Sequence, residues 1–100
     1  MEEASYRQSR LCRLLGNPLA FAVVELLAEN RELSVSEIAR VVGRSVQRVS
    51  TVLGVLRVAE VVRYQADGKH NRYRLKHPGE VKGILSALGR FVKSASAVRE

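Results

Sequence analysis

The spacing of hydrophobic residues changes twice along the chain, from helical to alternating and back to helical. Apolar residues three and four positions apart share one face of a helix, whereas apolar residues in alternate positions share one face of a strand. The first pattern predicts helices over residues 4–15, 18–29, 35–42, 46–59 and 79–97, and the second predicts strands over residues 61–65 and 71–76. A short edge strand is also expected at residues 33–35.

Residues that begin and end helices stand at the boundaries of these segments. Asn17 precedes a proline, which is the order of an N-cap and a first helical residue. Ser34 and Glu37 have the spacing of a capping box, in which each side chain bonds to the backbone N–H of the other. Gly43 is expected to end the third helix, and Ser45 to cap the fourth.

The apolar faces of the three central helices are expected to form the core. They consist of Phe21, Val24, Leu27 and Ala28 in the second helix, Ile38, Ala39 and Val42 in the third, and Val46, Val49, Leu53 and Leu56 in the fourth.

The first and last helices flank a domain that is complete without them. Their apolar stripes are therefore expected to be buried against a second copy of the chain. The alternative is that these stripes pack on the core of their own chain. The predicted dimer residues are Leu11, Leu14, Leu15, Ile84, Leu85, Leu88, Phe91 and Val92.

The two predicted strands are joined by Asp67-Gly68, a strong signal for a hairpin with a two-residue type I′ turn. This turn would pair Arg63 with Arg72 and Val62 with Tyr73. Directly opposed arginines repel each other, and phosphate groups nearby would offset that repulsion.

A short helix, a turn, a longer helix and a β-hairpin, in this order, form a winged helix-turn-helix. The predicted fold class is therefore mainly α with a small β-hairpin wing and about five helices. Residues 1–100 would form one domain, with the helix-turn-helix at 34–59, the wing at 61–76, and dimerisation helices at 4–15 and 79–97.

The basic charge of the chain is concentrated in this predicted unit. The net charge is +7, and residues 40–76 contain nine basic and two acidic residues, which gives 9 − 2 = +7. The remaining residues therefore sum to zero. Such a concentration predicts a surface that faces phosphates, so double-stranded DNA is the expected partner.

The fourth helix carries side chains suited to reading bases. At about 100° per residue, Gln47 and Thr51 lie opposite its apolar face, and Arg48 and Ser50 flank them. Such side chains can bond to base edges in the major groove. Ser45 is a cap whose helix amides can also hold a phosphate. The other predicted DNA-binding residues, mainly phosphate ligands, are Arg44, Arg63, Lys69, His70, Arg72 and Arg74.

Composition and motifs argue against a membrane protein, an enzyme and a metal site. The chain has no run of about 18 apolar residues and no apolar signal core at its start, so a cytoplasmic protein without membrane contact is expected. Cys12 is expected to be a small buried hydrophobe, with a redox pair across a dimer axis as the alternative. No catalytic constellation is present, and His70 and His77 lack further ligands for zinc. We therefore expect neither an enzyme nor a cofactor.

The chain resembles the ArsR/SmtB family of winged-helix repressors over about residues 10–92. The resemblance rests on LLGNPLAFAVVELL, LSVSEIARVVGRSVQRVSTVLGVLR and the wing DGKHNRYRL. It implies a homodimer joined through its terminal helices, which binds an inverted repeat in a promoter. It also implies repression that a metal, a metalloid or an oxidative signal relieves.

The chain departs from the family where signals are sensed. Ser34-Val35-Ser36 stands where metalloid sensors carry Cys-Val-Cys, and serine is a poor ligand for thiophilic metals. Residues 79–98 contain Glu80 but no His, Asp or Cys, and the chain has one cysteine where thiol switches need two. Ala20 and Glu60 replace the usual Arg and Gly of the family. Metal at the family's usual sites is therefore not expected.

The sequence predicts a homodimeric, sequence-specific transcriptional repressor. Two alternatives stay open: a winged-helix module that binds an acidic protein, and an architectural protein that binds DNA of any sequence. A small-molecule or redox inducer is compatible with the sequence, which does not identify it.

Overall fold

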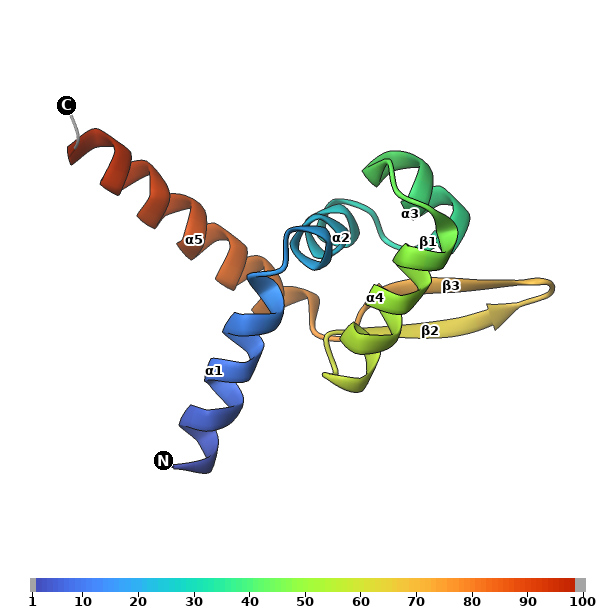
Figure 1. Ribbon diagram of the computed structural model, residues 1–100, viewed down its shortest axis with the longest axis horizontal. Coiled ribbons are helices and arrows are strands. Elements are labelled where there is room, and N and C mark those ends of the chain that lie inside the picture. Colours follow the sequence, from blue (N-terminus) through green and yellow to red (C-terminus); the bar gives the residue numbers. More distant parts are fainter. Residues whose placement is uncertain (1, 99–100) are drawn as a thin grey trace.

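The computed structural model describes residues 2–98 and confirms a winged helix-turn-helix (Figure 1). The elements are α1 (Glu3–Leu15), α2 (Pro18–Glu29), β1 (Leu33–Ser34), α3 (Val35–Val42), α4 (Val46–Val58), β2 (Val62–Asp67), β3 (His70–Leu75) and α5 (Pro78–Val98). Helices α2, α3 and α4 pack together, the β2–β3 hairpin projects at one end, and α1 and α5 diverge at the other.

The helix boundaries follow the predicted caps. The Asn17 side chain accepts a hydrogen bond from the Ala20 backbone N–H at 3.0 Å. Ser34 and Glu37 form both bonds of the capping box, at 3.2 and 2.8 Å. Gly43 ends α3 in the left-handed conformation with a φ of 70°, which favours glycine because no Cβ is present. The sharp turn between α3 and α4 therefore follows from local sequence.

The core lies between the three central helices and the base of the sheet. Its buried residues are Ala20, Val23, Val24, Leu27, Ile38, Ala39, Val49, Leu53, Leu56, Val61, Val62 and Leu75. Four predicted core residues are not fully buried: Phe21, Ala28 and Val42 are half-buried, and Val46 is 51% exposed. Val46 shares the apolar face of α4, but it is the first residue of the helix, and no described element covers that end.

The sheet has three antiparallel strands in the order β1-β3-β2. The predicted edge strand is confirmed as β1, which pairs Leu33 with Tyr73 and Ser34 with Arg72. The wing is therefore anchored to the start of α3 as well as to the end of α4.

The hairpin register differs from the prediction. Asp67 and His70 form the last pair, so Gly68 and Lys69 are the two central residues of the turn. Gly68 has a φ of 62°, and Lys69 does not have a positive φ. A type I′ turn needs positive φ at both central residues, whereas a type II′ turn needs it only at the first, where glycine is favoured. Gly68 therefore takes the first central position and not the second.

The predicted pairings of Arg63 with Arg72 and of Val62 with Tyr73 are consequently wrong. Arg63 pairs with Arg74, and Val62 pairs with Leu75. The partner moves by two residues, which keeps every side chain on its predicted face because strands have a period of two. An arginine still faces an arginine across the strands.

The turn after α4 contains a residue under backbone strain. Glu60 follows it with a φ of 67°, which is costly for a residue with a side chain. At this position the ArsR/SmtB family, which the sequence resembles, usually has glycine. The Glu60 carboxylate accepts a hydrogen bond from the Lys76 Nζ at 2.7 Å, and this ion pair helps to hold the turn between α4 and β2.

The pKa of Glu37 predicts one acid-sensitive contribution to stability. The backbone N–H and hydroxyl of Ser34 hold the pKa of this carboxyl below its usual value of 4.5. As the pH falls, the unfolded chain therefore binds a proton at Glu37 more readily than the folded chain does. The stabilisation by Glu37 is present above the pKa that this carboxyl has in the unfolded chain, and it is lost as the pH falls through its pKa in the folded chain. We expect Glu37→Gln to show a smaller loss of unfolding free energy than the natural protein between about pH 5 and pH 3 in urea titrations. Equal losses in both proteins would contradict this role.

The predicted dimer residues of the terminal helices fall into two groups by their burial. The first group is half-buried against the core of its own chain, which was the stated alternative to dimerisation, and consists of Leu11, Leu14, Leu15 and Leu85. Leu88, Phe91 and Val92 are 42%, 73% and 61% exposed, and Ile84 is half-buried. Cys12 is exposed, so its prediction as a buried hydrophobe is wrong.

No single described helix has the length and apolar composition needed to span a membrane; α1 and α2 meet those two criteria only as a pair, which is bent by 92°.

Candidate nucleic-acid interface

Helix α4 presents a polar surface opposite its buried face. Val49, Leu53 and Leu56 are fully buried and fix the orientation of the helix. All six residues predicted to bind DNA in and before α4 are exposed: Arg44, Ser45, Gln47, Arg48, Ser50 and Thr51. The polar side of an anchored helix thus lies open to solvent.

Hydrogen bonds distinguish among these residues. Ser45 Oγ accepts from the Arg48 backbone N–H at 3.2 Å, and Thr51 Oγ1 donates to the Gln47 carbonyl at 3.1 Å. Within residues 2–98, the Gln47 amide and the Arg48 guanidinium form no such bond. These two groups therefore retain their full capacity to bond to bases.

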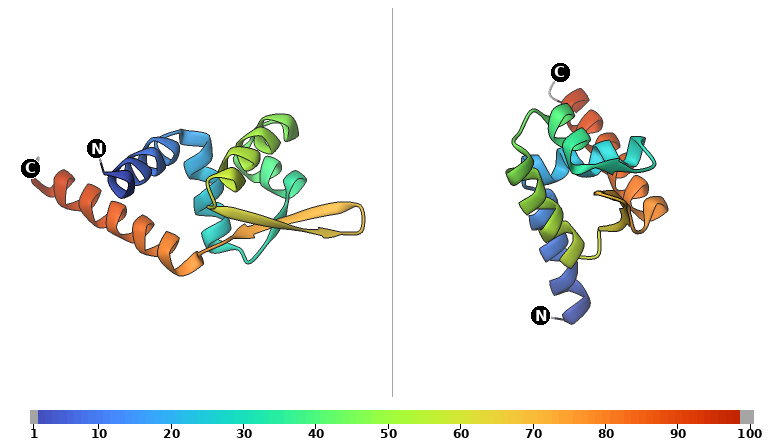
Figure 2. Two further views of the ribbon diagram at one scale, coloured as in Figure 1. Left: turned by 90° about the horizontal axis from the view of Figure 1, so that it is seen from below. Right: turned by 90° about the vertical axis from the view of Figure 1, so that its right-hand side faces the viewer.

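The hairpin extends beyond the N-terminal end of α4 (Figures 1 and 2). Lys69 and His70 are exposed at its tip. The tip and the first turn of α4 therefore lie toward the same end of the molecule, opposite the C-terminal end of α5.

A stack of side chains that was not predicted from the sequence connects the wing to α4. The Arg57 guanidinium carbon lies 5.1 Å from the ring centroid of Tyr64, and the rings of Tyr64 and Tyr73 are 5.6 Å apart. Cation–π and tilted aromatic contacts of this kind are each favourable. They link the last turn of α4 to both strands of the hairpin, which holds the wing in a fixed position beside α4.

Arg72 is held by two carboxylates. Its Nε lies 3.0 Å from Glu32 Oε1, and its Nη2 lies 3.7 Å from Glu37 Oε1. The side chain is half-buried. These pairs connect β3 to the segment that enters α3 and neutralise much of the Arg72 charge. Sequence reasoning missed them because Glu32 is 40 residues away in the chain.

Arg63 and Arg74 lie on the other face of the sheet from α4. They are paired across the strands, whereas their neighbours Val62 and Leu75 point into the core. Both arginines line a pocket at the base of the wing. Their role as phosphate ligands stays a prediction, and their face of the sheet is turned away from α4.

In the ArsR/SmtB family, which the sequence resembles, metalloid sensors bind their ligand at the positions of Ser34 and Ser36, but Ser34 has another role in this chain. Ser34 Oγ accepts a hydrogen bond from the Glu37 backbone N–H. Among the described residues, no three His, Cys, Asp or Glu side chains lie close enough together to hold a metal ion.

Comparisons with known proteins agree with this arrangement. A family model described as HVO_A0114 matches residues 17–79, which include the helix-turn-helix and the wing. A comparison with curated proteins gives no match.

Solved structures that are similar to the chain share its fold over nearly the whole length. Rv0081 of Mycobacterium tuberculosis is 27% identical with a TM-score of 0.88, and the match covers 99% of this chain and 98% of that one. The antimony-specific transcriptional repressor AntR is 25% identical with a TM-score of 0.81, with 96% and 86% covered.

Mb0332 of Mycobacterium bovis is a homodimeric winged helix-turn-helix DNA-binding domain described as a possible ArsR-family transcriptional regulator. It is 21% identical with a TM-score of 0.78, with 90% of this chain and 82% of that chain covered, and it supports the fold alone. Because the family model covers more than half of the chain, the chain belongs to the HVO_A0114 family, and it has the winged helix-turn-helix fold that it shares with these neighbours.

Proposed function

We propose that the protein is a homodimeric repressor that binds an inverted repeat in double-stranded DNA. Helix α4 enters the major groove, and the tip of the wing contacts the backbone or the adjacent minor groove. The observation that carries this proposal is the exposed polar side of α4, whose opposite face is fully buried, in a segment with a net charge of +7.

The free groups of α4 support sequence recognition. Gln47 can form paired hydrogen bonds with adenine, and Arg48 can do so with guanine or bind a phosphate. Ser45 and the amides at the start of the helix suit a backbone phosphate. Lys69 and His70 supply cationic and polar groups at the wing tip. Arg72 acts mainly by holding the wing in place, because two carboxylates already neutralise it.

The exposed apolar residues of α5 support dimerisation. Leu88, Phe91 and Val92 share one face of the helix at the end of the molecule opposite the wing. A two-fold axis there would bury this surface and place two copies of α4 for two half-sites of a repeat. Mb0332, which has the same fold, is described as homodimeric.

Repression is the regulatory outcome that we propose, because bound protein would exclude other proteins from a promoter. AntR, which is similar to this chain, is described as a repressor. We propose that no metal bound at Ser34 and Ser36 relieves the repression, since these hydroxyls are weak ligands for soft metals. The protein would bind DNA without catalysing a reaction.

Selection of bound duplexes from a random library, followed by fluorescence anisotropy, tests the proposal. The selected duplex should contain an inverted repeat, and its affinity should fall steeply with added salt. Gln47→Ala should reduce discrimination against the wrong base by about 1–3 kcal/mol. Lys69→Ala should weaken binding to all sequences alike. Arg13→Ala, which removes an exposed charge from α1, serves as the control and should have little effect.

Different results would support the alternatives. Equal affinity for selected and scrambled duplexes would indicate an architectural DNA binder. Unchanged duplex affinity after Arg48→Ala combined with Lys69→Ala would contradict the proposed interface. Recovery of an acidic protein with no DNA in pull-down experiments would indicate a protein-interaction module.

A further inference from the structure

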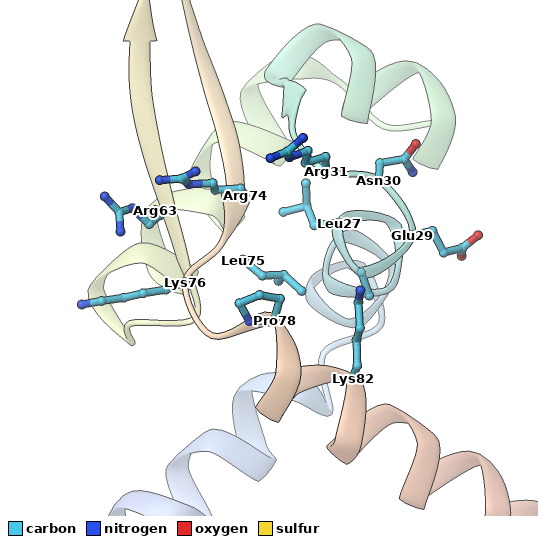
Figure 3. A pocket seen from close by; sticks show the side chains of 11 residues that line it. Leu27, Glu29, Asn30, Arg31, Arg63, Arg74, Leu75, Lys76, Pro78 and Lys82 are labelled. Atoms are coloured by element: carbon cyan, nitrogen blue, oxygen red, sulfur yellow. The ribbon is translucent and has the colours of Figure 1, made fainter.

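A pocket of about 530 Å³ lies where the base of the wing meets α2 and α5. Its volume is in the range of about 300–1,000 Å³ that small-molecule sites occupy. Leu27, Leu75 and Pro78 lie next to one another in its centre (Figure 3). The pocket thus has an apolar floor where α2, β3 and α5 meet, in which the core residues Leu27 and Leu75 expose only 3% and 5% of their surface.

Basic residues make up most of the polar lining of this pocket, and in Figure 3 two of them, Arg63 and Lys76, point their side chains away from its apolar centre. Five line the pocket against one acidic residue, Glu29, whose carboxylate points away from the centre (Figure 3). Lys76 is paired with Glu60 at 2.7 Å. The other four basic residues form no ion pair within the described part of the chain: Arg31, Arg63, Arg74 and Lys82.

The register places two of these cations in direct opposition. Arg63 and Arg74 pair across the hairpin on the same face. Like charges in this position destabilise a sheet, and a bound anion would remove the repulsion. Arg74 is also half-buried, so its charge is only partly screened by water.

Duplex DNA bound to α4 is a poor candidate for the anion. Figure 2 shows α4 on one side of the sheet and the first turns of α5 on the other. Residues Pro78 and Lys82 belong to those first turns and line the pocket. The pocket therefore opens on the side of the sheet away from α4.

We propose that this pocket binds a small organic anion, such as a dicarboxylate with an apolar body, and that the bound anion weakens DNA binding. The apolar floor suits the body of the ligand, and the unpaired cations beside it suit its acidic groups. The second part rests on the proposed function.

The position of the pocket gives the anion a route to the DNA-binding surface. One ligand would contact β3 through Arg74, the loop after α2 through Arg31, and α5 through Lys82. It would neutralise part of the positive charge that attracts DNA and would shift the base of the wing relative to the dimerisation helix.

The test uses phthalate as the probe, because it combines two carboxylates with an aromatic ring. Backbone amide NMR shifts are recorded for the full chain with phthalate, with inorganic phosphate and with the neutral ester dimethyl phthalate. We expect phthalate to shift the amides of Arg31, Arg63, Leu75 and Lys82 with a Kd of about 1 mM or tighter. The ester should cause no comparable shifts, and inorganic phosphate, which lacks the apolar body, should bind more weakly.

Paired variants locate the site. R31Q combined with K82Q should weaken phthalate binding at least tenfold. R7Q combined with R13Q removes the same charge from exposed positions of α1 and should leave phthalate binding unchanged. Phthalate at saturation should lower the DNA affinity of the natural protein at least threefold and should leave that of the R31Q/K82Q variant unchanged.

The remaining outcomes separate the two proposals. Absence of pocket shifts with phthalate, equal shifts with the neutral ester, or pocket shifts caused by duplex DNA itself would each overturn the anion site. Phthalate binding with no change in DNA affinity would overturn its regulatory role. Phthalate binding by a chain that binds no duplex at all would support the pocket and refute the proposed function.

Discussion

Phe91→Glu should convert the proposed homodimer into a monomer. Phe91 is 73% exposed in the single chain and lies beside Leu88 and Val92 on α5, so a partner would bury it. A carboxylate in that interface would lose its hydration without gaining a partner. Loss of a central aromatic contact raises a dimer dissociation constant about a hundredfold or more. Analytical ultracentrifugation across a concentration series measures the change.

Specific DNA binding should fall with the dimer, because each monomer contacts only one half-site. Ser86→Glu is the matched control: it adds the same charge to an exposed position of α5 opposite the apolar stripe and should leave the dimer intact. Circular dichroism should show the Phe91→Glu chain still folded, since the residue contributes little to its own core. A dimer of unchanged strength would rule out this face of α5 as the interface.

Leu53→Ala should cause the largest loss of stability. Leu53 lies in the centre of α4 with no exposed surface and packs among the other core residues. Truncation removes buried apolar surface and leaves a cavity, which together cost about 2–5 kcal/mol. Because a domain of this size is only marginally stable, unfolding in urea should shift to a much lower denaturant concentration.

Val58→Ala is the control on the same helix. Val58 is 82% exposed, and its truncation should change the unfolding free energy by no more than about 0.5 kcal/mol. Equal effects of the two substitutions would contradict the orientation of α4, and with it the assignment of its outward face to DNA.

Local features of the fold could be predicted from the sequence. The caps at Asn17, Ser34 and Ser45, and the end of α3 at Gly43, involve residues within a few positions of each other. The two faces of the hairpin were also correct, because alternation fixes them whatever the register. Such features depend on steric and hydrogen-bonding preferences that act over one or two turns of chain.

The outward face of α4 was predictable for the same reason, since helical spacing determines which residues oppose Val49, Leu53 and Leu56. The sequence does not show how far the core extends along a helix. Val46 therefore appeared equivalent to Val49, although one is half exposed and the other fully buried. Likewise, the apolar residues of the terminal helices looked alike, but Leu14 packs on its own core and Phe91 does not.

The sequence by itself determined the type and order of the elements, the basic charge of residues 40–76 and the polar character of the outward side of α4. Only the tertiary structure decided that Arg72 is neutralised by Glu32, that Arg57 stacks on Tyr64, and that Arg31 and Lys82 meet the base of the wing at one pocket. These contacts join residues distant in the chain, and their partners are set by how helices and sheet pack in three dimensions, which no local preference specifies.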